Sequence, residues 1–315
     1  MHYVANETAL RRNSYFRLIN DDHLLGESMM KKFFVSAAVV TSIANIAYAD
    51  DVKSVVESDG GSWLTMVGGT QEAQPHWITP LVTVTPRLEQ EFRYDQIRQY
   101  STGGVSKTFN GAGKGLELIP TENTEVIVGV PNYLTKDTPK TSTGGWQDET
   151  FLAKYRLLSA NEEHGNYIVT GFMGISVPTG DSNLTAQHTV FTPALSAGKG
   201  WGTREAGVDI QSTFAYSISS GDRSQIDIPS AAWNTAVQAH VFKYFWPEIE
   251  ANYTRFKQGP DAGRNQLVMT YGVILGRIPI QGRTNLIVGV GYQEPSGSSF
   301  STYNHGWNLS SRLTF

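Results

Sequence analysis

Five charged side chains occur at alternate positions within one short stretch of the sequence. Between Leu81 and Tyr100 the odd positions include Arg87, Glu89, Glu91, Arg93 and Asp95. The even positions are mostly apolar, namely Val82, Val84, Pro86, Leu88, Gln90, Phe92 and Tyr94. Successive side chains of a β-strand point to opposite faces. The stretch therefore predicts a strand with one apolar face and one charged face, and charges of both signs in a row can pair with each other or select ions in a polar passage.

Similar polar positions recur along the chain. If the apolar faces contact lipid, the predicted inward residues also include Glu117, Glu125, Lys154, Arg156, Asp209, Gln211, Gln238, His240, Glu248, Glu250 and Arg312. Burying so many charges in a dry interior is costly unless each is paired. Two interpretations are open. The residues either line a wet passage that sets solute selectivity, or they form ion pairs that fill a narrow barrel.

Period-2 alternation, rich in aromatic and β-branched residues, dominates the chain beyond residue 80. Besides 81–100, it predicts strands at about 113–120, 124–134, 149–159, 166–177, 189–198, 205–219, 231–246, 248–257, 265–276, 284–294 and 304–315. About twelve strands is an even number, as single-chain bacterial outer-membrane barrels require. We predict an all-β fold, a transmembrane antiparallel up-and-down β-barrel over residues 81–315.

The predicted connections alternate in length, as expected of a barrel with long extracellular loops and short periplasmic turns. The long ones are polar and rich in Gly or Ser, and they run over 100–111, 135–148, 180–188, 219–230 and 295–303. One short connection consists of little more than Trp246 and Pro247. Gly272, Gly289 and Gly291 lie within predicted strands, where we expect them to relieve crowding as a closed sheet curves.

The N-terminal part of the sequence contains a secretory signal. Residues 29–49 have two lysines, an apolar stretch and an Ala-Tyr-Ala motif ending at Ala49, so we expect cleavage there. We therefore expect residues 1–28 to be an upstream extension that is not native to the protein. We interpret residues 50–80 as a periplasmic segment that either enters the barrel or is a disordered leader. The signal exports the chain, and together with the predicted barrel it leads us to expect the protein in the bacterial outer membrane.

Apolar residues alternate up to the last residue of the chain, at Trp307, Leu309, Leu313 and Phe315, with Ser311 as the exception. In hydrocarbon an unpaired strand edge leaves backbone groups unsatisfied, so the last strand must pair with the first. A terminal Phe315 after alternating apolar residues is also typical of the signal read by the barrel-assembly machinery. Lipid is the expected partner of the outer face.

Composition excludes several other functions. The chain has no cysteine, and its net charge of −4 argues against nucleic acid as a partner. Glu162-Glu163-His164 lacks a second histidine, and Gly111–Gly115 lacks the spacing of a phosphate loop, so we predict no metal and no cofactor. His188 and His305 lie near serines without diagnostic spacing, and we predict no enzyme. A lipid hydrolase, or an adhesion or structural barrel whose loops carry Trp146 and Tyr303, remains an alternative.

One motif resembles a known family. Residues Pro178, Thr179, Gly180 and Asp181, in Ile175–Asp181, follow Phe151–Leu157 and precede Thr192–Gly198. This arrangement over residues 145–315 resembles outer-membrane transporters of the MetA-pathway phenol-degradation family. Gly145–Asp148 departs from the Gly-x-Gly-Asp arrangement typical of that family. The resemblance implies a barrel that passes small solutes, specifically hydrophobic or aromatic compounds. From the residues themselves we expect Pro178 to end a strand and Thr179–Asp181 to form a turn at the outer rim.

Overall fold

The structure, a computed structural model, describes residues 53–112, 114–297 and 300–315, with side chains from Trp63 onward. The chain divides into two units, Met1–Ser62 and Trp63–Phe315, and the second contains the sheet. The predicted signal peptide at 29–49, its cleavage at Ala49 and the upstream extension 1–28 lie outside the described residues. One helix, α2, spans Lys53–Glu72. No helix among the described residues is long and apolar enough to cross a membrane.

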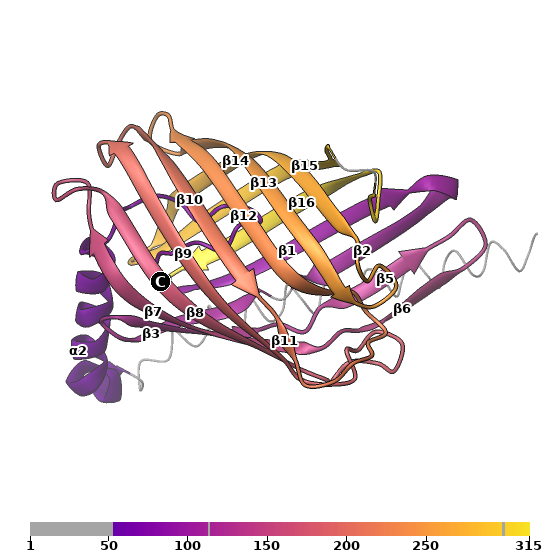
Figure 1. Ribbon diagram of the computed structural model, residues 1–315. Helices are drawn as coiled ribbons and strands as arrows, with labels where there is room; N and C mark the ends of the chain where they lie inside the picture. The colour runs from indigo at the N-terminus through magenta and orange to yellow at the C-terminus, as the bar shows by residue number, and fades with distance from the viewer. Residues whose placement is uncertain (1–52, 113, 298–299) are drawn as a thin grey trace, which may run out of the picture. The chain divides into compact units, whose positions relative to one another are not determined.

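The rest of the second unit is almost entirely β-structure, in neighbouring antiparallel strands (Figure 1). A short 3-10 turn, η2, covers Thr102–Gly104. The strands are β1 (Glu91–Ser101), β2 (Val105–Gly111), β3 (Gly115–Thr121), β4 (Thr124–Gly129), β5 (Tyr133–Asp137), β6 (Ser142–Trp146), β7 (Glu149–Ala160), β8 (Tyr167–Val177), β9 (Val190–Gly202), β10 (Gly207–Tyr216), β11 (Ile218–Ser219), β12 (Ile228–His240), β13 (Phe245–Gln258), β14 (Asn265–Gln281), β15 (Thr284–Pro295) and β16 (His305–Thr314).

The strands close into a barrel because the first pairs with the last. β1 and β16 are antiparallel from Glu91↔Thr314 to Tyr100↔His305. Several shorter strands are parts of one interrupted strand, since β3 pairs with β4 and, farther along, β2 pairs with β5. Counting β2/β3, β4/β5, β6/β7 and β10/β11 as single strands gives a closed barrel of 12 strands. The predicted fold class and the pairing of the terminal strand are thereby confirmed.

Side chains alternate between an apolar outer face and a polar inner face. Leu195, Phe214 and Leu309 point outward and are 54 %, 50 % and 50 % exposed, and many large apolar residues share this orientation. Their polar neighbours along the strands are buried. A closed barrel with an apolar outer surface satisfies its backbone hydrogen bonds internally and is a transmembrane barrel.

The structure corrects four predicted segments. The strand predicted over 81–100 begins only at Glu91, because Pro80 and Pro86 cannot donate to a ladder, and residues 81–90 have no strand structure. Two predicted loops, 100–111 and 135–148, contain β2 and the β5–β6 hairpin, so these strands extend farther than the alternation indicated. Trp246 and Pro247 lie within β13, and the preceding turn is at residues 241–244.

Candidate functional site in the barrel interior

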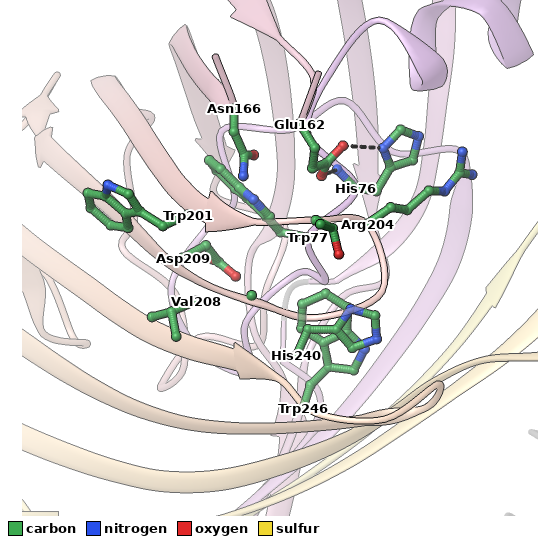
Figure 2. Close-up of a pocket in the computed structure, with 12 residues that line it drawn as sticks. His76, Trp77, Glu162, Asn166, Trp201, Arg204, Val208, Asp209, His240 and Trp246 are labelled. Atoms are coloured by element: carbon green, nitrogen blue, oxygen red, sulfur yellow. Dashed lines mark hydrogen bonds and ion pairs between the residues drawn. The ribbon is translucent and has the colours of Figure 1, made fainter. Parts of the chain in front are cut away.

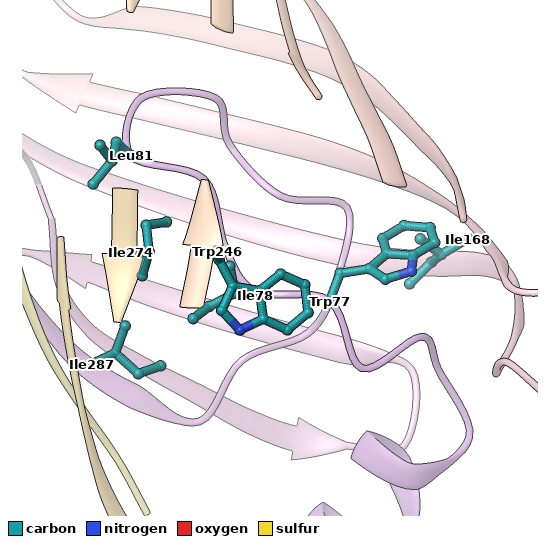
Figure 3. Packing of buried hydrophobic residues seen from close by; sticks show 7 residues of the cluster. All are labelled: Trp77, Ile78, Leu81, Ile168, Trp246, Ile274 and Ile287. Carbon is teal, nitrogen blue, oxygen red and sulfur yellow. The ribbon is translucent and has the colours of Figure 1, made fainter. Parts of the chain in front are cut away.

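A stretch of chain that precedes β1 runs through the inside of the barrel. It comprises residues 74–90, called here the interior segment, and it contains no helix or strand. All of its residues are buried except His76, Val82 and Val84, which are partly buried. Figure 3 shows Trp77, Ile78 and Leu81 of this segment among side chains from the surrounding strands. The interior of the barrel is therefore occupied by the chain itself.

Carboxylates of β13 bind the backbone of the interior segment. Glu250 accepts hydrogen bonds from the N–H groups of Val82 at 2.8 Å and Thr83 at 2.6 Å. Glu248 accepts one from the N–H of Leu81 at 3.2 Å. Buried N–H groups need a partner. No described strand forms a ladder with the segment, so these carboxylates accept the hydrogen bonds that the carbonyl groups of a neighbouring strand would accept in a sheet.

Arginines of the first and last strands bind its carbonyl groups. Arg93 of β1 donates to the carbonyl oxygen of Leu81 at 2.6 Å and forms an ion pair with Asp95 at 2.7 Å. Arg312 of β16 donates to the carbonyl oxygen of Pro80 at 2.9 Å. The pair of strands that closes the barrel thus also holds the interior segment.

A third set of contacts comes from β4 and β7. Lys154 donates to the carbonyl oxygen of Arg87 at 3.1 Å and forms an ion pair with Glu125 at 2.9 Å. Glu125 in turn accepts the N–H of Glu89 at 2.5 Å. Each charge here is both paired and hydrogen-bonded, which offsets the cost of removing it from water.

The structure buries every predicted inward charge, but not always in the barrel wall. The predicted residues Glu91, Arg93, Asp95, Glu117, Glu125, Lys154, Arg156, Asp209, His240, Glu248, Glu250 and Arg312 are buried on strands. Arg87 and Glu89 instead belong to the interior segment, where they pair with each other at 2.7 Å, so their placement on a strand was wrong. That any of these residues line a solute path stays a prediction.

Three glycines of β14 and β15 form a recess for Leu81, called here the glycine cradle: Gly272, Gly289 and Gly291. A β-carbon added at any of them would lie 2.6 to 2.8 Å from a δ-carbon of Leu81, closer than real β-carbons approach other atoms. Ile78 lies close against Gly276 in the same way. These glycines make room for the interior segment, and their predicted relief of sheet curvature stays a prediction.

An apolar cluster surrounds this contact (Figure 3). Its buried members are Trp77, Ile78, Leu81, Ile168, Trp246, Ile274 and Ile287. Fully burying one such side chain stabilises by about 1.5–3 kcal/mol. The cluster is thus the main apolar attachment of the interior segment to the barrel wall.

A small polar pocket lies where the interior segment begins (Figure 2). Its volume of about 10 Å³ has room for about one water molecule. Glu162, in the turn between β7 and β8, accepts the N–H of His76 at 2.6 Å and contacts its ring nitrogen Nδ1 at 2.8 Å. Burial alone raises the pKa of Glu162, but the hydrogen bonds from His76 outweigh it and lower the pKa to about 2.

A larger cavity adjoins Thr79, Val84 and Thr85 of the interior segment and faces β1, β3, β4, β7, β8 and β9. Its volume is about 210 Å³. The lining mixes apolar, hydroxyl and charged side chains, among them Val84, Thr85, Arg93, Lys114, Glu117, Ile127, Leu152, Lys154 and Ile175. Arg93, Glu117 and Lys154 are the predicted inward residues that reach it.

The motif at Pro178–Asp181 has a structural partner in Gly145–Asp148. The Asp181 carboxylate accepts the N–H of Trp146 at 2.8 Å, and the Asp148 carboxylate accepts the N–H of Gly180 at 3.0 Å. The hydroxyl of Thr179 accepts the N–H of Glu149 at 3.0 Å. The two sequence motifs thus bind each other beyond the ends of β6 and β8, where they fix the connection between β8 and β9.

The structure also shows the surroundings of the residues that a hydrolase or an adhesion barrel would use. The ring of His305 stacks on Tyr100 with a centroid distance of 4.9 Å, and His188 has a buried Nε2. Neither ring has a hydrogen bond from a serine in the described part of the chain. Among the same residues, no three His, Asp or Glu side chains are grouped to hold a metal ion. Trp146 is exposed, but Tyr303 is buried and is not available to a partner.

Solved structures of porins and outer-membrane channels are similar to this chain. A KdgM porin is 9 % identical with a TM-score of 0.42, over 71 % of this chain and 99 % of that one. An outer-membrane channel from Pseudomonas putida F1 is 14 % identical with a TM-score of 0.44, over 71 % and 94 %. A NanC porin is 11 % identical with a TM-score of 0.42, over 70 % and 98 %. No protein-family model and no curated protein sequence matches this chain.

The closed barrel and its apolar outer surface confirm the predicted location in the bacterial outer membrane.

Sequence reasoning missed two parts of the site. It placed residues 81–90 on a strand, although Pro80 directly precedes this stretch and Pro86 within it cannot donate to a ladder. It also considered Gly111–Gly115 only as a phosphate loop, whereas Lys114 of this stretch lines the larger cavity.

Proposed function

We propose that the protein is an outer-membrane channel through which small solutes pass once the interior segment is displaced. The observation that carries the proposal is the polarity of the wall behind the segment. The wall holds the segment largely through charged and amide side chains, such as Glu250 and Arg312. These groups can be hydrated by water as readily as they bind a backbone, so the wall remains compatible with an aqueous passage.

A wall built only for stability has cheaper solutions. Replacing buried ion pairs by packed apolar residues is often neutral or stabilising by about 1–4 kcal/mol. The charges are therefore better explained by a state in which they face water. In that state Glu91, Arg93, Asp95, Lys154, Asp209, Glu248, Glu250 and Arg312 would line the path and set ion preference.

The finer part of the proposal concerns the solute and the assembly route. The resemblance at Pro178–Asp181 supports small hydrophobic or aromatic compounds as solutes. The alternation of Trp307, Leu309, Leu313 and Phe315, with Trp307 and Leu309 facing outward, supports recognition of β16 by the barrel-assembly machinery. Surface lipid contacts the same outward residues.

A reversible lock on the interior segment tests the proposal. The chain has no cysteine, so Leu81→Cys with Gly291→Cys introduces a single thiol pair where the segment meets the cradle. We expect no conductance steps in planar bilayers after oxidation and discrete steps after reduction. Each single-cysteine variant is the control, because it should respond to neither treatment. Slower migration after heating on a denaturing gel shows that the barrel is folded.

One observation favours a second function, a closed barrel with a structural role. The described interior is occupied, and Arg93–Asp95 and Lys154–Glu125 are paired as in the ion-pair interpretation. If the folded double-cysteine variant conducts in neither redox state, this second function is the correct one.

A further inference from the structure

The larger cavity has the size of a small organic molecule. Its volume is about 210 Å³. By comparison, an apolar cavity of about 150 Å³ inside a protein binds benzene. A compound with one ring, or a chain of similar volume, together with one or two polar substituents therefore fits. Val84, Ile127, Leu152 and Ile175 supply apolar contact for its body.

Two of the four charged side chains that line the cavity are already engaged. The guanidinium of Arg93 binds Asp95 and the carbonyl oxygen of Leu81. The ammonium of Lys154 binds Glu125 and the carbonyl oxygen of Arg87. Both groups have their strongest partners within the protein, so neither is the main binding group for a ligand.

Lys114 and Glu117 are different. Over the described residues, the Lys114 ammonium has no ion pair or hydrogen bond, and the Glu117 carboxylate has none either, although Glu117 is only 4 % exposed. The two groups attract each other electrostatically but form no direct ion pair, and both face the same cavity. Glu117 is buried and Lys114 is partly exposed, and a buried charged group without a direct partner is costly. A ligand with complementary groups would remove that cost.

We infer that this cavity binds a small organic anion with an apolar body, whose carboxylate pairs with Lys114 and whose hydroxyl donates to Glu117. The inference rests on the proposed function and names its solute class, since the cavity would be a recognition site beside the path. A charge-assisted hydrogen bond to the Lys114 ammonium is about twice as strong as a neutral one. The neutral analogue of a bound acid therefore loses much of its affinity.

Binding of 4-hydroxybenzoate to the full chain in detergent micelles, measured by titration calorimetry, tests the inference. We expect it to bind about tenfold or more tightly than 4-hydroxybenzamide, the neutral analogue of the same size. Benzoate, which lacks the hydroxyl, should bind more weakly than 4-hydroxybenzoate, and Glu117→Gln should reduce that difference. Equal binding of the acid and the amide would overturn the inference.

Variants at two lysines identify the binding group. Lys114→Met should weaken 4-hydroxybenzoate binding about tenfold, and Lys114→Arg, which keeps the charge, should restore most of it. Lys140→Met is the matched control, because Lys140 is exposed in the turn between β5 and β6. Equal losses in the Lys114→Met and Lys140→Met variants would contradict a role for the cavity, and heat-modifiable migration shows that each variant folds.

The binding result and the conductance result separate the two proposals. Calorimetry in micelles needs no passage through a membrane. A protein that binds 4-hydroxybenzoate through Lys114, yet conducts in neither redox state of the cysteine lock, overturns the channel and leaves the binding site. A protein that conducts after reduction but shows no Lys114-dependent binding overturns the site alone.

Discussion

The interior segment is held differently on its two sides. Toward β14 and β15, Leu81 fills the glycine cradle and belongs to a dry apolar cluster. Toward β3, β4 and β7, a cavity of about 210 Å³ adjoins the segment, which is held there by the hydrogen bonds of Lys154 and Glu125 and by the packing of Leu88 on Ile119. The apolar side is tightly packed, whereas the polar side has free volume and two charges that no described residue pairs. The segment is thus packed without free volume at the glycine cradle and has free volume beside it at the cavity.

This difference indicates which contacts control opening. Apolar burial gives a net gain of about 25 cal/mol for each Å² removed from water. A buried ion pair, by contrast, often gains little over its desolvation cost. We therefore expect the cradle side to set the free energy needed to displace the segment, and the cavity side to set what is recognised.

The largest effect should come from filling the cradle. In Gly291→Leu the added side chain occupies the position of Leu81, so the interior segment cannot dock and the barrel should conduct continuously. Conductance in planar bilayers is the measurement. Gly171→Leu is the matched control, because nothing lies within 4 Å of a β-carbon added there. Unchanged conductance in Gly291→Leu would show that the segment does not block the path.

The next effect concerns the ion pair on the cavity side. Lys154→Met leaves the buried Glu125 without its partner and should lower the free energy of unfolding by about 3–5 kcal/mol. The double variant Lys154→Met with Glu125→Leu should recover much of this loss. Urea unfolding in detergent micelles measures both. A double variant as unstable as the single one would mean that the pair contributes net stability.

A smaller effect is expected from shortening Leu81, the side chain that fills the glycine cradle. Leu81→Ala leaves a void in the cradle and should reduce the free energy that holds the segment by about 2–3 kcal/mol. Faster protease cleavage within residues 74–90, with the barrel itself intact, is the expected result. Val82→Ala, next in sequence and only partly buried, should change the rate much less. Equal rates for the two variants would place the attachment elsewhere.

The smallest effect concerns acid pH at the small pocket. The pKa of Glu162 is lowered from 4.5 to about 2 in the folded protein, so its stabilising contribution is complete above about pH 4.5 and is lost as the pH falls toward 2. Proteolysis of the interior segment by an acid-active protease should accelerate over that range. Glu162→Gln should be insensitive to it, and an equal acceleration in that variant would assign the effect to other carboxylates.

Much of the wall could be predicted from the sequence, because strand alternation is a local property. The positions of Trp307, Leu309 and Arg312 on opposite faces followed from period 2 alone and agree with their exposure. Arg87 and Glu89 are exceptions, for which alternation predicts the wrong structure. They continue the alternation of β1, yet they lie on the interior segment, because alternation cannot distinguish a strand from an extended chain that binds side chains.

By itself the sequence determined a closed barrel with an apolar outer face. Each strand has an apolar and a polar face, and the unpaired backbone groups of the last strand can be satisfied in hydrocarbon only by pairing with the first strand. Only the tertiary structure decided what fills that barrel. The fit of Leu81 to three glycines from two other strands, and the lack of a described partner for Lys114, depend on which side chains meet across the interior. No local sequence pattern encodes these side-chain contacts, because they join residues that lie far apart along the chain.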